Sequence, residues 1–430
     1  MSERILVVSP RYWPENVKIN DICEGIADRG YGVDCLCGQP QTPAGRFFDG
    51  YHSMGHKSER HKGVRILRHF ETKRGSGTGF RIMLQYLTSS FFANRALHRI
   101  KKRSYEAVLI FQTSPVMTCT AGLRVAKKQN IPAVTYAIDI WPESLERELD
   151  MQNLLLRRIF KSISDRKYRA SDEIVTLTKP AEQYFTEELS IHSGRVRSIV
   201  PGPDSCIQRG SASDELLERF SGGFNILTFD PALDRQDYDT LLKGAEMIRD
   251  TGMIGIRIII VCSVDPEELE RMIADRDLND IVFVENVKDA ISGAGHYRIA
   301  SAFLSCERES AGDEYSFPHD LINYMSCARP VIFAGDGDGR RIIREAGCGE
   351  TVDPEDAEAL FNAVIALYRT PKEDLSAMGD AAAAYQKKNF SRSSCIDRLL
   401  EVLFRKRDES DDDFIISSGN IIRSDDLFEE

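Results

Sequence analysis

The stretch Ile5-Leu6-Val7-Val8-Ser9, ended by Pro10, is an apolar run of strand length. Such a run is typical of a parallel strand that is covered by helices on both faces. Residues 19–29 follow with apolar side chains at helical spacing and stop at Gly30, which predicts a helix. Because Val33–Cys37 reads as the next strand, the chain opens with the strand, helix and strand of a doubly wound parallel sheet.

The same alternation continues along the chain. Further strands are expected at 107–111, 133–138, 225–229, 256–262, 281–284, 302–305 and 330–333, with helices between them and a last helix over 381–403. A chain of 430 residues exceeds what one hydrophobic core normally supports. We therefore predict the α/β class, with two Rossmann-like parallel-sheet domains that face each other across a ligand-binding cleft.

The segment Pro201-Gly202-Pro203 reads as the hinge between these domains. Residues 1–202 are the expected first domain and residues 203–384 the second. The last helix, at about 385–405, is expected to pack back on the first domain. Residues 407–430 are expected to be an acidic tail outside the fold, because the segment from Lys406 onward holds nine acidic residues against three basic ones.

The overall composition limits the classes of partner and compartment. The 56 Lys and Arg against 67 Asp and Glu give a net charge of −11, which argues against nucleic acid as a partner. The ten cysteines are too sparse for a disulfide scaffold. The apolar runs are only strand-sized and the N-terminus leads directly into a strand, so neither a membrane span nor a signal peptide is expected. We therefore expect a cytoplasmic protein.

Positive charge is concentrated between Arg60 and Arg103, where twelve Lys or Arg stand against one acid, Glu71. Within this segment, one helical stripe is apolar and a neighbouring face is basic: Phe80, Leu84, Leu87 and Phe91, then Arg81, Arg95, Arg99 and Lys102. An amphipathic helix over 80–103 suits an anionic membrane surface. A packed core helix with solvated arginines fits the pattern equally well.

Several motifs resemble those of one enzyme family. Asp139-Ile140-Trp141-Pro142-Glu143-Ser144 closely resembles an Asp-Leu-Trp-Pro-Glu-Ser motif, and Tyr324-Met325 followed by Pro330-Val331-Ile332 matches in order and spacing. Residues 342–349 and 353–360 continue the match. By these motifs the chain is similar to the family 4 retaining glycosyltransferases of the GT-B fold, in a subgroup of bacterial surface-polysaccharide enzymes.

The resemblance implies an enzyme that moves a sugar from a nucleotide-diphosphate sugar to a glycan or polyprenyl-linked acceptor. It implies no metal and no other cofactor, so cationic side chains and helix N-terminal amides must neutralise the departing diphosphate. A lipid-linked acceptor would bring the protein to the inner face of the plasma membrane. Another glycosyltransferase subunit is a further candidate partner.

The donor-site motifs of the family are altered in this chain. The expected glycine-containing loop appears as Phe229-Asp230-Pro231-Ala232-Leu233-Asp234, without glycine. In the segment that reads Ser-Lys-x-x-Glu-Tyr-Met in the family, alignment on Tyr324 places His319 at Ser, Asp320 at Lys and Asn323 at Glu. A carboxylate ~4–5 Å from a phosphate is repelled by about 3–4 kcal/mol at an effective dielectric constant near 20.

Other residues are candidates to compensate in the donor site. Arg235 and Lys243 follow the first strand of the second domain and are candidates to reach a diphosphate, or else form a solvated helix face. Gly337, Gly339 and Arg340 open a later helix and are candidates to supply amides and a guanidinium, or else form a tight turn. Asn323 can still hydrogen-bond a ribose hydroxyl.

The first domain supplies the acceptor-side candidates. Asp139 and Glu143 are candidates to position an acceptor hydroxyl or accept its proton, with a helix cap and a packed corner as the alternatives. Glu15 and Asn16 are expected beside the acceptor, unless they belong to an ordinary loop. Three functions thus compete: an active glycosyltransferase, a catalytically degenerate partner or scaffold subunit, and a binding module without turnover.

Overall fold

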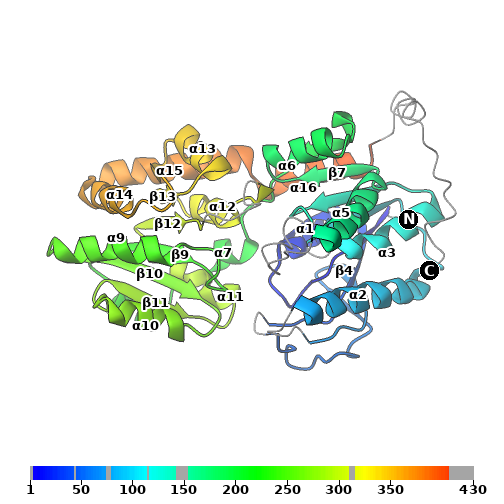
Figure 1. Ribbon diagram of the computed structural model, residues 1–430, viewed down its shortest axis with the longest axis horizontal. Coiled ribbons are helices and arrows are strands. Elements are labelled where there is room, and N and C mark those ends of the chain that lie inside the picture. The colour runs from blue at the N-terminus through cyan, green and yellow to red at the C-terminus, as the bar shows by residue number, and fades with distance from the viewer. Residues whose placement is uncertain are drawn as a thin grey trace.

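Two parallel β-sheets, each covered by helices on both faces, form two domains that lie side by side (Figure 1). The structure, a computed structural model, describes residues 3–42, 45–73, 79–113, 116–141, 154–308 and 315–405. Both sheets have the doubly wound α/β arrangement that the alternation of strands and helices predicts.

The first sheet has eight strands among the described residues, in the order β3-β4-β2-β1-β5-β6-β7-β8, and only β3 and β4 are antiparallel. The strands are β1 (Arg4–Val8), β2 (Gly32–Cys37), β3 (Ser58–His61), β4 (Val64–Arg68), β5 (Ala107–Gln112), β6 (Ala133–Ala137), β7 (Glu173–Thr176) and β8 (Val196–Ser198). The helices are α1 (Lys18–Asp28), α2 (Gly79–Ala96), α3 (Cys119–Gln129), α5 (Leu154–Arg169) and α6 (Lys179–Gln183), with short turns η1 (Leu97–Ile100), η2 (Val116–Thr118), η3 (Tyr184–Glu188) and η4 (Ser193–Arg195).

Strand β1 shows why this sheet is covered on both faces. Its side chains Ile5 and Val7 pack in one buried cluster, and Leu6 and Val8 pack in another. Successive side chains of a strand point to opposite faces, so an unbroken apolar run requires helices on each side.

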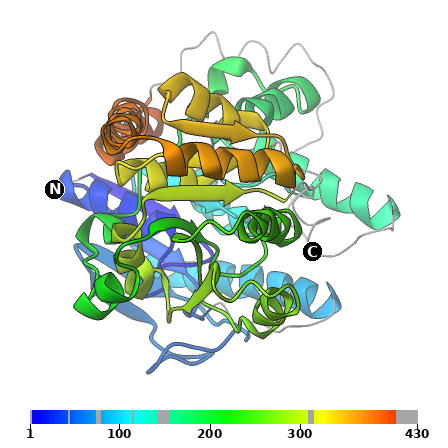
Figure 2. The same ribbon diagram turned by 90° about the vertical axis from the view of Figure 1, so that its left-hand side faces the viewer.

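The second sheet has six parallel strands in the part of the chain that the structure describes, in the order β11-β10-β9-β12-β13-β14. The strands are β9 (Phe224–Phe229), β10 (Ile256–Cys262), β11 (Val282–Asn286), β12 (Ala302–Cys306), β13 (Val331–Ala334) and β14 (Gly349–Val352). The helices are α7 (Ser205–Arg209), α8 (Asp214–Arg219), α9 (Tyr238–Asp250), α10 (Glu267–Asp275), α11 (Ala290–Gly293), the turn η5 (Ala294–Arg298), α12 (His319–Ser326), α13 (Gly337–Ala346), α14 (Ala357–Arg369), α15 (Lys372–Asn389) and α16 (Arg392–Leu403). Helices α9, α10 and α14 cover one face of this sheet and α12 and α13 the other (Figure 2).

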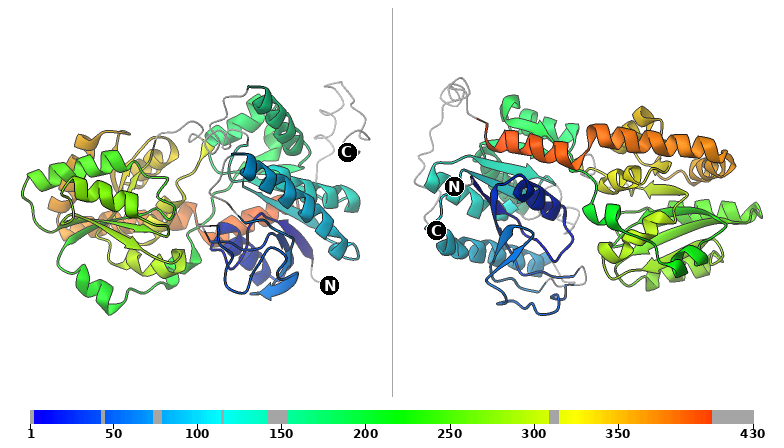
Figure 3. Two further views of the ribbon diagram at one scale, coloured as in Figure 1. Left: turned by 60° about the horizontal axis from the view of Figure 1, so that its bottom comes forward. Right: turned by 180° about the vertical axis from the view of Figure 1, so that it is seen from behind.

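The predicted single helix over 381–403 is wrong, because the chain forms α15 and α16 there. Ser391 separates them, and its Oγ accepts a hydrogen bond from the Ser394 amide at 3.1 Å. A serine in this position begins a new helix. Helix α15 packs on α12 and α13 of the second domain, whereas α16 packs on α1, β5 and β6 of the first (Figure 3, right).

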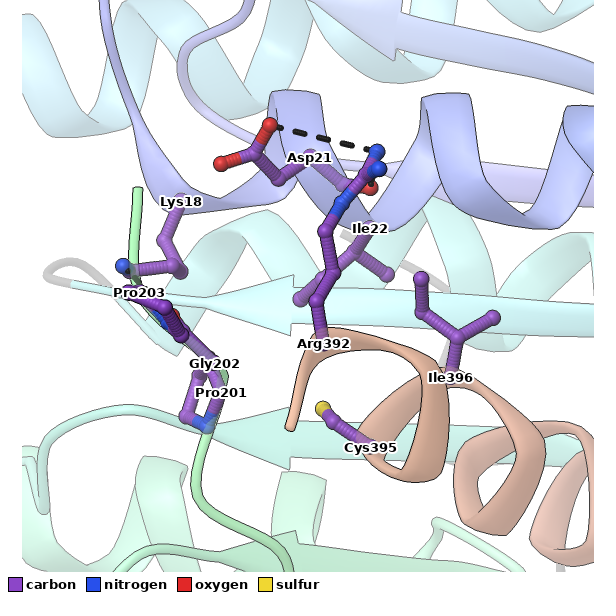
Figure 4. A pocket seen from close by; sticks show the side chains of 9 residues that line it. All are labelled: Lys18, Asp21, Ile22, Pro201, Gly202, Pro203, Arg392, Cys395 and Ile396. Carbon is purple, nitrogen blue, oxygen red and sulfur yellow. Dashed lines mark hydrogen bonds and ion pairs between the residues drawn. The ribbon is translucent and has the colours of Figure 1, made fainter. Parts of the chain in front are cut away.

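The chain therefore crosses between the domains twice, at Gly202 and again near Arg392. These two crossings touch, since a Cβ added at Gly202 would lie 2.7 Å from the Arg392 Cα. Arg392 also donates to the Asp21 carbonyl oxygen of α1 at 2.8 Å. A small pocket of about 10 Å³ lies beside this contact, lined by residues of both crossings and by Lys18 of α1 (Figure 4).

Candidate functional site

The loop after β9 lies at the carboxyl edge of the second sheet, where the resemblance places the donor diphosphate. Asp230, which follows β9, is fully buried, and its carboxylate accepts a long hydrogen bond from the Asp234 amide at 3.4 Å and shorter ones from three further groups of the loop and the start of α9. These are the Arg235 amide at 3.1 Å, the Gln236 amide at 3.2 Å and the Tyr238 hydroxyl at 2.9 Å. Amides arranged in this way bind anions. Here the resident carboxylate of Asp230 takes that position.

The same loop keeps a glycine-like backbone without a glycine. Leu233 has a φ of 56°, in the left-handed region that favours glycine, and its amide donates to the Asp230 carbonyl oxygen at 3.2 Å. A side chain in this conformation costs roughly 1–2 kcal/mol. The hydrogen bonds to Asp230 offset that cost and fix the loop.

Arg235 and Asp320 form an ion pair across this edge. The Arg235 Nη1 lies 2.9 Å from the Asp320 Oδ2, joining the loop after β9 to the first turn of α12. The Arg235 side chain remains 36% exposed and that of Asp320 only 16%. Burial raises the pKa of Asp320 from its ordinary 3.8 to about 6, although Arg235 acts in the opposite direction. The pKa of Arg235 is raised chiefly by Asp320.

Asn323, predicted to hydrogen-bond a ribose hydroxyl, lies at the junction of the two domains. It is 3% exposed, its Oδ1 accepts from the Asp204 amide at 2.9 Å, and its Nδ2 donates to the Asp204 Oδ2 at 2.9 Å. Asp204 in turn binds Lys18 Nζ of the first domain at 2.5 Å. Asn323 therefore belongs to the domain junction, as its two polar atoms are both used there.

His319 begins α12 and lies near the same junction. Burial, together with the positive charges of Lys18 and Arg235, lowers its pKa to about 3. A neutral imidazole at this position supplies no positive charge to stabilise a diphosphate. Among the predicted donor residues on α12, only Asp320 is brought together with Arg235.

Lys243, also predicted as a donor residue, lies apart from the Arg235–Asp320 pair. It lies on the exposed face of α9, where Nζ pairs with the Asp239 carboxylate of the same helix at 2.7 Å. Its side chain is 58% exposed. This is the solvated helix face that the sequence left as the alternative.

Gly337, Gly339 and Arg340 form the turn from β13 into α13. Gly337 has a φ of 72°, and a Cβ at Gly339 would lie 2.2 Å from the Phe333 ring. The Arg340 guanidinium donates to the Gly335 carbonyl oxygen at 2.9 Å and pairs with Asp353 at 2.6 Å. These contacts hold the turn together, as the tight-turn alternative describes, and the donor role of the three residues stays a prediction.

On the first domain, Asp139 follows β6 and is held by a chain of buried hydrogen bonds. Gln112 Nε2 donates to the Asp139 Oδ1 at 2.9 Å, and the Tyr168 hydroxyl donates to the Gln112 Oε1 at 3.1 Å. Gln112 and Tyr168 are both fully buried. No sequence signal points to these two residues, because they lie 27 or more positions from Asp139 in the chain. Glu143, the second predicted base, lies outside the described residues.

Glu15 and Asn16 have different surroundings. Glu15 is 6% exposed, and its carboxylate accepts from the Gln41 amide at 3.1 Å, so it fastens a loop. Asn16 is exposed and its Nδ2 lies 3.7 Å from the Cys206 Sγ of α7. Asn16 thus stands where the two domains meet, whereas Glu15 is turned inward.

The predicted amphipathic segment forms α2 and η1. Leu87 and Phe91 are 53% and 62% exposed, and Arg95, one turn further on, is also exposed. The side chains of Phe80, Arg81 and Leu84 lie outside the described residues. Arg99 does not face solvent freely, since it donates to the Arg68 carbonyl oxygen at 2.6 Å. No helix within the described part of the chain is long and apolar enough to cross a membrane.

Comparison with solved structures identifies the fold. Sucrose-phosphate synthase from Thermosynechococcus elongatus superposes with a TM-score of 0.70 at 15% identity, covering 93% of this chain and 98% of that one. Anabaena Alr3699/HepE, solved in complex with UDP and glucose, gives 0.65 at 13% identity, covering 94% and 100%. WaaG, a glycosyltransferase involved in lipopolysaccharide biosynthesis, gives 0.63 at 13% identity, covering 94% and 100%. The predicted GT-B fold is confirmed.

Sequence comparison identifies the class of the second domain. Residues 226–370 match the family described as Glycosyl transferases group 1. No curated protein sequence matches the chain significantly. The second domain is therefore similar to the group 1 glycosyl transferases, within a chain that has the GT-B fold.

Proposed function

We propose that the protein transfers a sugar from a nucleotide-diphosphate sugar to a glycan or lipid-linked acceptor, with retention of configuration, in the synthesis of a cell-surface polysaccharide. The observation that carries this proposal is the position of Arg235, a half-buried cation beside the first turn of α12 at the carboxyl edge of the second sheet. Ligands of doubly wound sheets bind at this edge. A guanidinium there is suited to hold a phosphate through two hydrogen bonds.

The relatives support the donor and the pathway. The Anabaena protein was solved with UDP and glucose, which supports a UDP-sugar as the donor of this chain. WaaG is involved in lipopolysaccharide biosynthesis, which supports a surface polysaccharide as the product. The retaining outcome rests on the motif resemblance described above.

In the proposed reaction, the bond between the anomeric carbon and the diphosphate oxygen breaks and negative charge grows on the diphosphate. Arg235 offsets that charge, so we propose that no metal or other cofactor is needed. Asp139, held in place by Gln112, orients the acceptor hydroxyl or accepts its proton. The acceptor enters from the first domain, near the exposed Asn16.

Nucleotide binding tests the donor part of the proposal. Thermal unfolding is measured with UDP, GDP and dTDP, each at about 100 times its dissociation constant, where a ligand adds about 2.7 kcal/mol to the free energy of unfolding. An Arg235→Gln variant should lose most of the shift, and Lys243→Gln, which removes a cation outside the site, should keep it. The donor assignment fails if no nucleotide shifts the wild-type transition.

A second candidate function is a catalytically degenerate partner subunit of another glycosyltransferase. The observation in its favour is that Asp230 fills the amide loop and Asn323 is engaged at the junction. Restoring the family residues by combining Asp320→Lys with Asn323→Glu is the test. Nucleotide binding gained only by that variant would favour the subunit function, and binding by the wild type would oppose it.

We also propose that the protein is peripheral at the inner face of the plasma membrane, with α2 as the contact. Leu87, Phe91 and Arg95 support this, because exposed apolar side chains beside a cation suit an anionic lipid surface. Flotation with phosphatidylglycerol-containing liposomes should be lost on combining Phe91→Ser with Arg95→Glu. Ile254→Ser, which removes an 89% exposed side chain from the second domain, is the control and should float like the wild type.

A further inference from the structure

We propose that Asp320 is a resident counter-ion, which holds Arg235 at the proposed donor site and must release it when a donor diphosphate binds. This proposal rests on the proposed function and concerns the regulation of the same site. It makes Asp320 the residue that decides how strongly, and at which pH, the site accepts an anion.

The argument begins with the geometry of the ion pair. The Arg235 Nη1 lies 2.9 Å from the Asp320 Oδ2, so one face of the guanidinium fork is already occupied by a carboxylate. Phosphate oxygens prefer the same fork geometry. A diphosphate and Asp320 therefore compete for Arg235, and both cannot hold it with full charge at hydrogen-bonding distance.

The loop amides offer no second place for the diphosphate. Asp230 receives the Arg235 and Gln236 amides and the Tyr238 hydroxyl, and it is fully buried. This carboxylate is anchored from several sides, whereas the carboxylate of Asp320 has a single hydrogen-bond partner among the described residues, Arg235. We therefore expect the diphosphate to displace the carboxylate of Asp320, in the first turn of α12, rather than that of Asp230.

The surroundings of Asp320 favour its neutral form once Arg235 is taken away. The charged and titratable groups around the pair come from every element packed there: Arg235 and Asp230 of the β9–α9 loop, Glu307 after β12, Asp204 of the interdomain linker, Tyr297 of η5, and His319 and Tyr324 of α12. Lys18 is directed to Asp204. Three of these groups are carboxylates, so an Asp320 that loses Arg235 to a phosphate is expected to take up a proton.

Two measurable consequences follow. Binding of UDP, GDP or dTDP should strengthen as the pH falls from 7.5 toward 5.5, because protonation removes the competitor from Arg235. Binding at pH 6.5–7 should also be accompanied by net proton uptake. An Asp320→Asn variant, which keeps the shape of the side chain without its charge, should bind at least about tenfold more tightly at pH 7.5 and lose both effects.

Isothermal titration with each nucleotide provides the test, run at several pH values and in buffers of different ionisation enthalpy. The full-length wild type is compared with Asp320→Asn and with Asp250→Asn, a charge-matched control at the far end of α9 where the carboxylate is 66% exposed. The wild-type pH series needs no variant, so the proposal stays testable even if Asp320→Asn folds poorly.

The outcomes separate this proposal from the proposed function. Tighter, pH-independent binding by Asp320→Asn, beside weaker and pH-dependent binding by the wild type, supports the proposal. Wild-type binding that equals that of Asp320→Asn, with no proton uptake, overturns the proposal and leaves the donor function standing. Absence of binding by every protein overturns both.

Discussion

The carboxyl edges of the two sheets have the same topology but opposite chemistry. In the first domain, Asp139 follows β6 half-buried, with a neutral amide from Gln112 holding one of its oxygens. In the second, Asp230 follows β9 and is turned inward onto its own loop. The difference shows that the sheet topology sets the position of a site, whereas the hydrogen bonds of each loop determine whether its carboxylate is available to bind a ligand.

The largest expected effect comes from removing Asp230. Asp230→Ala leaves two buried amides and the Tyr238 hydroxyl without their acceptor, which should lower the free energy of unfolding by about 3 kcal/mol. Urea unfolding measures this effect. Asp265→Ala, in the exposed loop after the neighbouring strand β10, should cost less than about 1 kcal/mol. Equal costs for the two variants would show that Asp230 is not the internal anchor of its loop.

On the first domain, Asp139→Asn should affect activity more than stability. If the carboxylate orients or deprotonates the acceptor, the rate of nucleotide-diphosphate release from the donor should fall about 100-fold. Gln112→Leu removes only the amide that positions Asp139 and should cost about tenfold. If Asp139→Asn releases nucleotide diphosphate at the wild-type rate and is as stable as the wild type, Asp139 has no role in the reaction. It would then be a structural carboxylate, like Asp230.

The pH dependence of stability should show the contribution of Asp320. Its folded-state pKa of about 6 lies above the ordinary 3.8, so the folded state keeps a proton that the unfolded chain loses. Its contribution to the free energy of unfolding is therefore full below about pH 4 and is lost as the pH rises through about 6, by about 3 kcal/mol in all. The difference in unfolding free energy between wild type and Asp320→Asn, measured from pH 4 to 7, should carry this slope. A flat difference would contradict the raised pKa.

The smallest effect is expected at Lys243. Its pair with Asp239 joins two exposed side chains of one helix, so Lys243→Ala should change the free energy of unfolding by less than about 0.5 kcal/mol. It should also leave nucleotide binding unchanged. A loss of nucleotide binding by Lys243→Ala would instead place this lysine in the proposed donor site.

The sequence predicts the sheets well because a strand that is buried on both faces consists of a continuous run of apolar residues. Ile5–Val8 and Ile256–Cys262 are read directly from their apolar runs, and both are central strands. The exposed strand β3 lacks such a run and was not predicted, although its pairing with β4 extends the sheet.

The site is less predictable because its contacts join distant positions. Asn323 meets Asp204 across 119 positions, and Arg235 meets Asp320 across 85. Spacing along the chain could name Asn323 and Asp320 as residues of interest but could not assign their partners. The buried Gln112 and Tyr168 had no motif at all, since a hydrogen-bond chain within a core leaves no periodicity in the sequence.

The double crossing of the domain junction makes the second domain an insertion into the first. The chain leaves at Gly202 and returns at Arg392, and these two points touch. Truncation after the hinge would strip the first domain of α16 and expose the α1 surface that it covers. A short bridge from Gly202 to Ser391 would instead keep that core whole. The second domain is in this sense an insert held between two fixed ends of the first.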